Sequence, residues 1–558
     1  MERPASGSRI SGASAWLYVI PAILGLIVAF GEALHGPFIF DDFHLPFHNP
    51  QAGQMPAWFW IGGVRPLLMV TYWVNFALSG TDPYSYHIVN LVLHFAASAL
   101  FFLILRRLGT LVPAIPNWSA WFGAGLFMLH PLQTDSVDYV AGRSEILCTV
   151  FVFLAWLLFL RYFDTKLSAV ATIGIVLCTA AAALSKESGI CAWALMICTD
   201  VYWNKNGIVT QVRRKAALYL MGLAGLVAAV FLIFRMLRGS STAGFGMGVT
   251  PGAYALTQCR AILTYLRLFF WPAGQSLVWR LPTWHSLWEG GAWIYVIGLA
   301  ALITGVCFFY SRLRVVSFGV LLFLLALMPT SSFVPLEENL AERRMYLPLA
   351  GLIIAVAGVA GHLRIGARAR TAGFILVLTA AALASHGRSH LWSDDVLMWQ
   401  SVVARDPANA HAHSWLAGAL AMRGNCGAAA REYQSSVSIE GMTPDNGSNL
   451  ATAFECSRQP ELALATWRQL VKLHPSANAW NRIGYLEALR NNIEPALDAF
   501  EDALRLDPDN ATAYAYRGTA KLAIRRNTEA KEDFLRALAL DPGNAAAAAG
   551  MTRLAKEQ

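Results

Sequence analysis

Two consecutive segments decide the fold of the C-terminal part of the chain: ANAWNRIGYLEALRNNIEPALDAFEDALRLDP at 477–508 and NATAYAYRGTAKLAIRRNTEAKEDFLRALALDPGNA at 510–545. A shift of 34 residues places Gly484 on Gly518 and Phe500 on Phe534. Self-similarity at a fixed period of this size indicates a repeat architecture, in which each unit packs mainly on its neighbours.

The small and aromatic residues of these units match the tetratricopeptide pattern, whose repeat is a pair of α-helices. Equivalent starts fall at Ala410, Pro444, Ala477, Ala511 and Ala545. We therefore predict an α-solenoid over 410–558, with a capping helix over 545–558 and a connecting helix over 391–409. The stacked units bury a continuous core and present a concave face.

The preceding residues have the composition of a membrane protein. Residues 1–390 carry 41 charged side chains, whereas the 168 residues from 391 to 558 carry 37. The first part is too poor in charge for a soluble domain, in which about a quarter of the residues are charged. The net charge of +8 does not indicate nucleic-acid binding, because basic loops at a membrane surface explain it.

Eleven apolar segments approach the length needed to cross a bilayer, which is about twenty helical residues. They are 14–34, 85–105, 117–131, 145–161, 167–184, 188–203, 216–236, 290–310, 315–329, 347–363 and 371–387. Two more apolar stretches, 64–80 and 254–271, contain or adjoin arginines, and we predict that they lie on the outer membrane surface. The predicted fold class is all-α: a polytopic membrane bundle of about 11 spans over 1–390, followed by the solenoid.

Loop charges predict the orientation of the bundle. With the N-terminus in the cytoplasm, the cytoplasmic side holds fifteen basic and three acidic residues, in agreement with the positive-inside rule. An odd number of spans then places the solenoid outside the cytoplasm, in the periplasm of a bacterium or in the lumen of a eukaryotic endoplasmic reticulum. Cys426 and Cys456 of the solenoid have no metal-ligand spacing, and an oxidising compartment would allow a disulfide between them.

Acidic and basic residues gather in the outward loops. The first of these loops, GPFIFDDFHLPFHNP, carries Asp41 and Asp42. Later loops contribute the acids Asp135, Asp138, Glu145, Glu187 and Glu342 and the bases Arg143, Lys186 and Arg343. Ionisable residues at membrane depth are costly and often mark a functional site.

This charge pattern suits the transfer of a group from a lipid carrier, since the outer face has no nucleotide pool. Arginine and lysine would stabilise the charge that develops on a prenyl-phosphate leaving group, and a carboxylate would act as general base on an incoming hydroxyl. One carboxylate with a cationic clamp suits an inverting displacement. A divalent metal on Asp41, Asp42 and His44 is an alternative; we favour a loop role for the histidine and expect no firmly bound cofactor.

Several motifs together resemble those of the TMTC proteins, which are transmembrane O-mannosyltransferases with tetratricopeptide repeats. In chain order they are FDD, RPLLMVTYWVNFALSG, YHIVNLVLHF, HPLQTDSV, AGRSEIL, ALSKESG and AERRMYLP. The resemblance implies a GT-C membrane glycosyltransferase with Asp41 or Asp42 as catalytic carboxylate, Asp41 being favoured as the base. It also implies that Arg143, Lys186 and Arg343 occupy the family's basic positions and that Arg65 lies in its Arg-Pro-Leu motif. Their contact with the donor phosphate is inferred from charge and side.

The expected function is transfer of a sugar, mannose or another hexose, from a polyprenyl phosphate to Ser or Thr hydroxyls of a polypeptide held by the solenoid. Two alternatives are a transporter or flippase of lipid-linked sugars and a non-catalytic membrane scaffold. A transporter is disfavoured because no internal hydropathy repeat is visible. A scaffold leaves the charged outward loops unexplained.

Overall fold

The structure is a computed structural model that describes residues 12–49, 51–204, 207–237 and 242–557. Within these ranges the regular secondary structure is helical, apart from one isolated β-bridge between Ala243 and Leu336. The chain divides into two compact units, Met1–Met398 and Trp399–Gln558. The prediction of an all-α fold is therefore confirmed for the described part of the chain.

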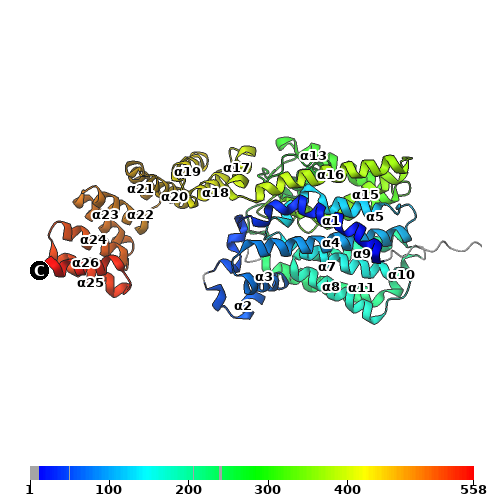
Figure 1. Ribbon diagram of the computed structural model, residues 1–558, viewed down its shortest axis with the longest axis horizontal. Helices are drawn as coiled ribbons and strands as arrows, with labels where there is room; N and C mark the ends of the chain where they lie inside the picture. The colour runs from blue at the N-terminus through cyan, green and yellow to red at the C-terminus, as the bar shows by residue number, and fades with distance from the viewer. Residues whose placement is uncertain (1–11, 50, 205–206, 238–241, 558) are drawn as a thin grey trace, which may run out of the picture. The chain divides into compact units, whose positions relative to one another are not determined.

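The first unit is a bundle of helices, most of which lie side by side (Figure 1). Its α-helices are α1 (Gly12–Phe30), α2 (Ala57–Ile61), α3 (Pro66–Ser79), α4 (Pro83–Leu111), α5 (Ser119–Leu129), α6 (Thr134–Val137), α7 (Arg143–Arg161), α8 (Ala169–Ser185), α9 (Cys191–Trp203), α10 (Ile208–Arg214), α11 (Ala216–Leu237), α12 (Pro251–Phe270), α13 (Ala292–Phe308), α14 (Arg314–Leu327), α15 (Pro348–His362) and α16 (Ala367–Trp392). Short 3₁₀ turns between them include η2 (Phe40–His44), η6 (Glu187–Ile190) and η8 (Glu342–Met345).

A helix forms within each of the eleven segments predicted to cross the membrane, and α3 and α12 form in the two segments predicted to lie on its surface. Among the described residues, four helices are long and apolar enough to span a bilayer: Pro83–Leu111, Arg143–Arg161, Glu289–Phe308 and Ala367–Trp392. Seven shorter helices are also apolar. The count of eleven spans stays a prediction.

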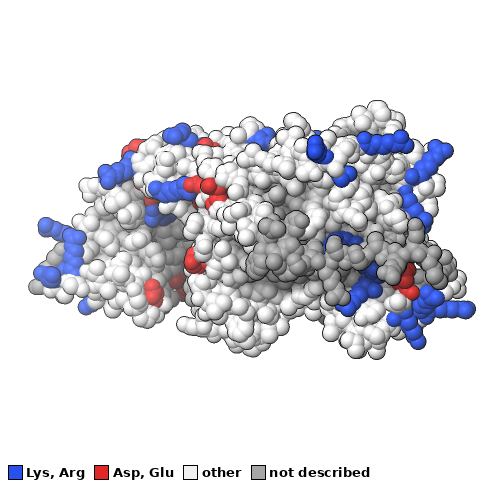
Figure 2. Space-filling model, turned by 45° about the vertical axis from the view of Figure 1, so that its right-hand side comes forward, with Lys and Arg blue, Asp and Glu red and all other residues white. Residues whose placement is uncertain are grey.

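The helices of this bundle run in both directions along it, and its two ends differ. We call the polar end the one formed by the C-termini of α1, α8, α14 and α16 and the N-termini of α4, α7, α9 and α15. The loops that carry the predicted site lie at this end. The opposite end, the basic end, holds Arg161 of α7, Arg213 and Arg214 of α10 and Arg314 of α14. Figure 2 shows many Lys and Arg side chains at this end, next to a wide uncharged surface.

Two glycines fix the packing of α14 on α15. A Cβ atom at Gly319 would lie 2.5 Å from the backbone nitrogen of Ala355, and one at Gly351 would lie 2.5 Å from that of Phe323. The two backbones are therefore in direct contact, as small residues allow between apolar helices. This contact sets the position of η8, which precedes α15 at the polar end.

The second unit is the solenoid. After α17 (Asp395–Arg405), its helices are α18 (Ala410–Met422), α19 (Cys426–Glu440), α20 (Pro444–Cys456), α21 (Pro460–Leu473), α22 (Ala477–Leu489), α23 (Ile493–Leu506), α24 (Ala511–Ala523), α25 (Asn527–Leu540) and α26 (Ala545–Glu557). The first helix of every pair, and α26, begin at the predicted repeat starts, so the predicted register is confirmed (Figure 1).

The repeated glycine and phenylalanine positions are one packing unit. A Cβ atom at Gly484 would lie 2.6 Å from the ring of Phe500, and one at Gly518 would lie 2.8 Å from the ring of Phe534. A disulfide also joins Cys426, at the start of α19, to Cys456, at the end of α20. It ties the first two repeats together covalently.

Candidate active site

Asp42 is a buried carboxylate that holds the first loop in place. Its Oδ2 accepts a hydrogen bond from the Ile39 N–H at 3.1 Å, and its Oδ1 accepts one from the Ala141 N–H at 2.8 Å. The residue is only 1% exposed, and burial raises the pKa of its carboxyl group to about 7. One oxygen of Asp42 therefore closes a turn within the 36–49 loop, and the other joins this loop to the segment just before α7.

Asp41 points the other way and stays accessible. Its side chain is 45% exposed, and its Oδ2 lies 3.9 Å from Nη2 of Arg343. Its backbone N–H donates to the Tyr139 hydroxyl at 2.9 Å. Burial raises the pKa of Asp41, and the charge of Arg343 acts in the opposite direction. Asp41 is thus the member of the pair that a substrate can reach.

The turn that carries the two carboxylates begins with an unfavourable backbone conformation at Phe40. Phe40 has φ of +56°, a left-handed conformation that is unfavourable for a bulky side chain. Such strain persists where the surrounding contacts enforce it, and it is common at active sites. Here the hydrogen bonds of Asp42 on one side and of Tyr139 on the other hold the turn.

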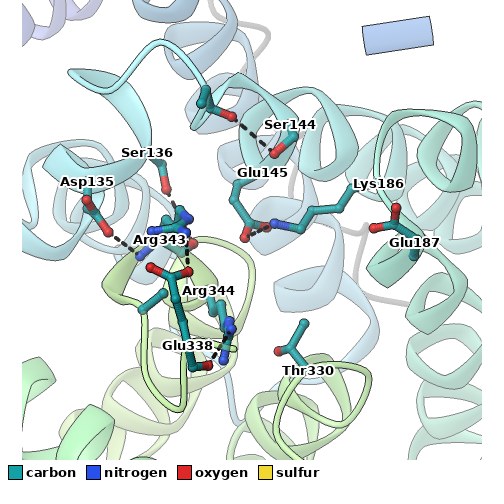
Figure 3. Close-up of polar contacts among 12 residues, drawn as sticks. Asp135, Ser136, Ser144, Glu145, Lys186, Glu187, Thr330, Glu338, Arg343 and Arg344 are labelled. Atoms are coloured by element: carbon teal, nitrogen blue, oxygen red, sulfur yellow. Dashed lines mark hydrogen bonds and ion pairs between the residues drawn. The ribbon is translucent and has the colours of Figure 1, made fainter. Parts of the chain in front are cut away.

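Arg343 lies among Asp135, Ser136, Glu338 and Arg344, and we call these five residues the polar cluster (Figure 3). Its Nη2 is paired with Glu338, its backbone N–H donates to Asp135 Oδ2 at 2.8 Å, and its carbonyl accepts from the Ser136 hydroxyl at 3.3 Å. Its guanidinium also lies 5.8 Å from the centre of the Tyr139 ring. The side chain is thereby fixed beside Asp41 from several directions.

Two arginine nitrogens of this cluster are buried without a hydrogen-bond acceptor among the described residues: Nη1 of Arg343 and Nη1 of Arg344. Arg344 is itself held by its Nη2, which donates to the Glu338 carbonyl at 2.8 Å. A buried guanidinium N–H without a partner costs free energy, and a phosphate oxygen would provide the acceptor in bidentate fashion. The pair Arg343 and Arg344 is therefore the best anion-binding element of the polar end.

A second pair of ion pairs lines the same end. Lys186 Nζ is bonded to Glu145, and Arg65 forms a two-bond contact with Glu187 at 3.0 and 2.9 Å. Burial lowers the pKa of Lys186, Glu145 opposes this shift, and the nearby charges of Arg65 and Arg343 add to it. Figure 3 shows Glu145 and Lys186 next to each other, beside the polar cluster around Arg343. All the predicted cations except Arg143 thus come together.

Arg143 faces the protein interior. It is fully buried, and its three nitrogens donate to Asn90 Oδ1 at 2.8 Å, to Asn75 Oδ1 at 2.7 Å and to the Tyr86 carbonyl at 3.0 Å. Its guanidinium also lies 4.7 Å from the centre of the Tyr72 ring. The phosphate contact predicted for Arg143 does not agree with this geometry. The residue instead joins α3, α4 and α7, which carry the site.

The predicted supporting acids have different surroundings. Glu342 is completely buried and accepts from the Ser276 N–H at 2.6 Å, the Trp279 indole at 2.8 Å and the Gln275 amide at 2.7 Å. It anchors the 275–279 segment against η8. Asp138 is also buried, and the positive charge of Arg388 lies near it.

No group of three or more His, Cys, Asp or Glu residues arranged for a metal ion is found in the described ranges. Asp42 uses both its oxygens on backbone N–H groups, and His44 is exposed at the end of η2. The geometry thus gives no support to the alternative metal site on Asp41, Asp42 and His44.

Three residues of the site were not assigned from the sequence: Tyr139, Glu338 and Arg344. Glu338 and Arg344 lie in the loop LEENLAERRMYLP, which the charge pattern singles out. A double arginine directly before a buried helix is a signal that could have identified Arg344. Tyr139 gives no such signal, because its role comes from a contact with Asp41 that spans 98 residues.

Comparison with known proteins gives relatives over most of the chain. A protein O-mannosyl-transferase of Caenorhabditis elegans is 23% identical over 442 residues, which cover 74% of this chain and 61% of that protein. The human protein O-mannosyl-transferase TMTC3 is 24% identical over 607 residues, which cover 94% of this chain and 64% of that protein. The chain spans about three fifths of the length of these relatives. The predicted resemblance to the TMTC proteins is confirmed.

The tetratricopeptide repeat family matches residues 397–446, 449–511 and 490–545. Among solved structures, YrrB, a tetratricopeptide protein with an unusual peptide-binding site, is similar at 18% identity and a TM-score of 0.27. That match covers 32% of this chain and 89% of YrrB. The match to the repeat family, together with the helix pairs of the second unit, identifies its repeats as tetratricopeptide repeats.

Proposed function

We propose that this protein is a membrane glycosyltransferase that moves mannose or another hexose from a polyprenyl phosphate to Ser or Thr hydroxyls of a polypeptide. One observation carries the proposal: the half-exposed carboxylate of Asp41 lies beside Arg343, and Nη1 of Arg343 has no acceptor among the described residues. A general base and an anion-binding group next to each other are what glycosyl transfer from a phosphate requires.

The proposed reaction is one inverting displacement. The acceptor oxygen attacks the anomeric carbon of the sugar while Asp41 takes the hydroxyl proton. The bond between that carbon and the phosphate oxygen breaks, and the electron pair leaves with the prenyl phosphate. Arg343 and Arg344 stabilise the growing negative charge on the phosphate, where charge-assisted hydrogen bonds are strongest. Glu338 acts as a positioning residue, because it holds both arginines.

Lys186 and Arg65 complete the field of positive charge at this end. Each is neutralised by its own acid, Glu145 or Glu187. Arg65 is more accessible than Lys186, since its side chain is 36% exposed. We assign Arg65 to the donor phosphate or pyranose hydroxyls at the rim and Lys186 to positioning of the buried side of the cluster.

Two observations support an extracytoplasmic location of the polar end and the solenoid. The opposite end holds Arg161, Arg213, Arg214 and Arg314, as the positive-inside rule predicts for the cytoplasmic side. The Cys426–Cys456 disulfide is typical of an oxidising compartment. A lipid-linked donor is then the available sugar source, and the solenoid holds the acceptor polypeptide.

The test is transfer by the purified full-length protein from a short-chain prenyl-phosphate mannose to a Ser/Thr-rich peptide, with the added hexose read by intact mass. Wild-type protein and the Glu337→Gln control should both label the peptide, because Glu337 is an exposed acid of the same loop. Asp41→Asn should not. Unlabelled peptide with every prenyl-phosphate hexose tried would contradict the proposal, and loss of transfer with a chelator would require a metal-dependent mechanism.

A further inference from the structure

The basic end of the bundle contains a cavity that the proposed reaction does not use. It has a volume of about 360 Å³ and is formed where α4, α9 and α15 end and α14 begins. Its polar lining includes Arg312, Arg314 and His362, and its apolar lining includes Val112 and Val315. None of its lining residues is Asp or Glu. The lining of the cavity thus combines basic and apolar side chains.

Arg314 is held in place by one of its terminal nitrogens and by two aromatic rings. One terminal nitrogen of Arg314 donates to the Tyr202 carbonyl, and its guanidinium lies 5.1 Å from the centre of the Trp203 ring and 5.5 Å from that of Tyr310. An arginine in the first turn of a helix is electrostatically unfavourable, because the helix N-terminus is itself positive. A bound anion would relieve this repulsion. Leu313, which precedes α14, gives no side-chain cap to the helix.

Two further hydrogen-bond donors at the cavity, the Trp203 indole and the Arg312 guanidinium, could also bind an anion. Nε1 of Trp203, which lines the cavity, is buried and has no hydrogen-bond acceptor among the described residues. Arg312 is exposed and makes no ion pair or hydrogen bond within the described ranges. The nearby acid Asp200 does not compete for these cations, since it is paired with Lys215 at 2.6 Å and bonded to Tyr219.

We propose that this cavity binds the phosphate headgroup of an anionic phospholipid. The phosphate oxygens contact Arg312, Arg314 and the Trp203 indole, and the glycerol and upper acyl carbons lie against Val112 and Val315. Basic pockets between membrane helices are suited to such headgroups. The site lies at the opposite end of α15 from Asp41, so it is separate from the donor phosphate. A free phosphate ion shares the headgroup chemistry but lacks the acyl chains that the apolar lining would cover.

The experiment places full-length protein in nanodiscs of phosphatidylcholine, with or without a quarter of phosphatidylglycerol, and then measures by native mass spectrometry the lipid retained after extraction into detergent. Wild-type protein should retain phosphatidylglycerol in preference to phosphatidylcholine. Arg312→Gln/Arg314→Gln should reduce this retention by about tenfold or more, because the variant removes two charge-assisted contacts to the phosphate. The control Arg364→Gln/Arg368→Gln removes two exposed charges near the same end and should retain the lipid like wild type.

Equal loss in the control would show attraction by surface charge alone and would overturn the proposal. So would equal retention of both lipids, or displacement of the lipid by millimolar inorganic phosphate, which would identify a site for the free ion. Arg312→Glu alone is the second variant, since the contact of Arg314 with Tyr202 could matter for folding. If this folded variant retains phosphatidylglycerol unchanged, the proposal is wrong.

Discussion

Asp41 and Asp42 are neighbours in the chain, yet their carboxylates have opposite surroundings. Asp42 is 1% exposed and bonded through both oxygens to the backbone, whereas the Asp41 side chain is 45% exposed and lies 3.9 Å from Arg343. They are consecutive residues of the 3₁₀ turn η2, so their side chains leave the turn in different directions. This division assigns chemistry to Asp41 and loop support to Asp42.

Asp41→Asn should lower kcat for transfer by about 10²–10⁴-fold, the usual cost of losing a positioned general base. Thermal unfolding of the variant should match wild type, because this side chain is not part of the core. Asp42→Asn should instead lower the unfolding temperature, since its amide cannot accept both backbone hydrogen bonds. A reversed pattern, with Asp42→Asn inactive at unchanged stability, would assign the base to Asp42.

The pH dependence of kcat/KM should report on Asp41 and Arg343. A base works when ionised, and burial raises the pKa of Asp41, so activity should fall on acidification at a higher pH than an ordinary aspartate would give. Arg343 favours the ionised form. Arg343→Gln should therefore move the acidic limb to still higher pH, while Arg344→Gln should not. An acidic limb that moves to lower pH in Arg343→Gln, or that moves equally in both variants, would count against the interaction of Asp41 with Arg343.

Arg344→Gln should weaken donor use. The variant removes Nη1 of Arg344, one of the two buried arginine nitrogens that have no hydrogen-bond acceptor among the described residues. A charge-assisted hydrogen bond from such a nitrogen to the donor phosphate contributes about 1.5–3 kcal/mol. We expect kcat/KM for the lipid donor to fall about 10- to 150-fold with little change in KM for the peptide. Arg344→Lys keeps the positive charge but lacks the two parallel N–H groups of a guanidinium, so it should recover only part of the lost donor use. An effect confined to the peptide would place Arg344 in the acceptor site.

Cys456→Ser should destabilise the solenoid by about 2–4 kcal/mol, the typical contribution of a disulfide. Urea unfolding of the full-length protein, followed by tryptophan fluorescence, would measure this change. Reductant should bring wild type to the level of the variant and leave the variant unchanged. Cys307→Ser, which removes an exposed free cysteine, is the control and should behave like wild type with and without reductant.

Ending the chain after Met398 should separate catalysis from recruitment. The first unit is compact by itself, so it should still transfer sugar to a short Ser/Thr peptide. Labelling of a long polypeptide acceptor should fall, because the concave face of the repeats is gone. Equal labelling of long and short acceptors by the shortened and complete proteins would remove the recruitment role of the solenoid.

The sequence was sufficient for the solenoid because its packing is local. Gly484 and Phe500 meet within one repeat, and the spacing that brings them together is visible in the chain. Asp41 and Arg343 could also be selected, since charged residues are rare in the first unit. Arg143 could not be placed: its burial depends on Asn75 and Asn90, which come from other helices and are polar residues within apolar runs. The same holds for Tyr139, whose partner is distant in the chain.

The Cys426–Cys456 bond makes the solenoid mechanically asymmetric. It fuses the first two repeats, whereas the later ones are joined by non-covalent packing in which each repeat supports only the next. Under tension or heat the later repeats should therefore separate from one another before the cross-linked pair does. A polypeptide bound along the concave face would then lose its contacts with the later repeats first and those with the cross-linked pair last, so release would proceed in one direction.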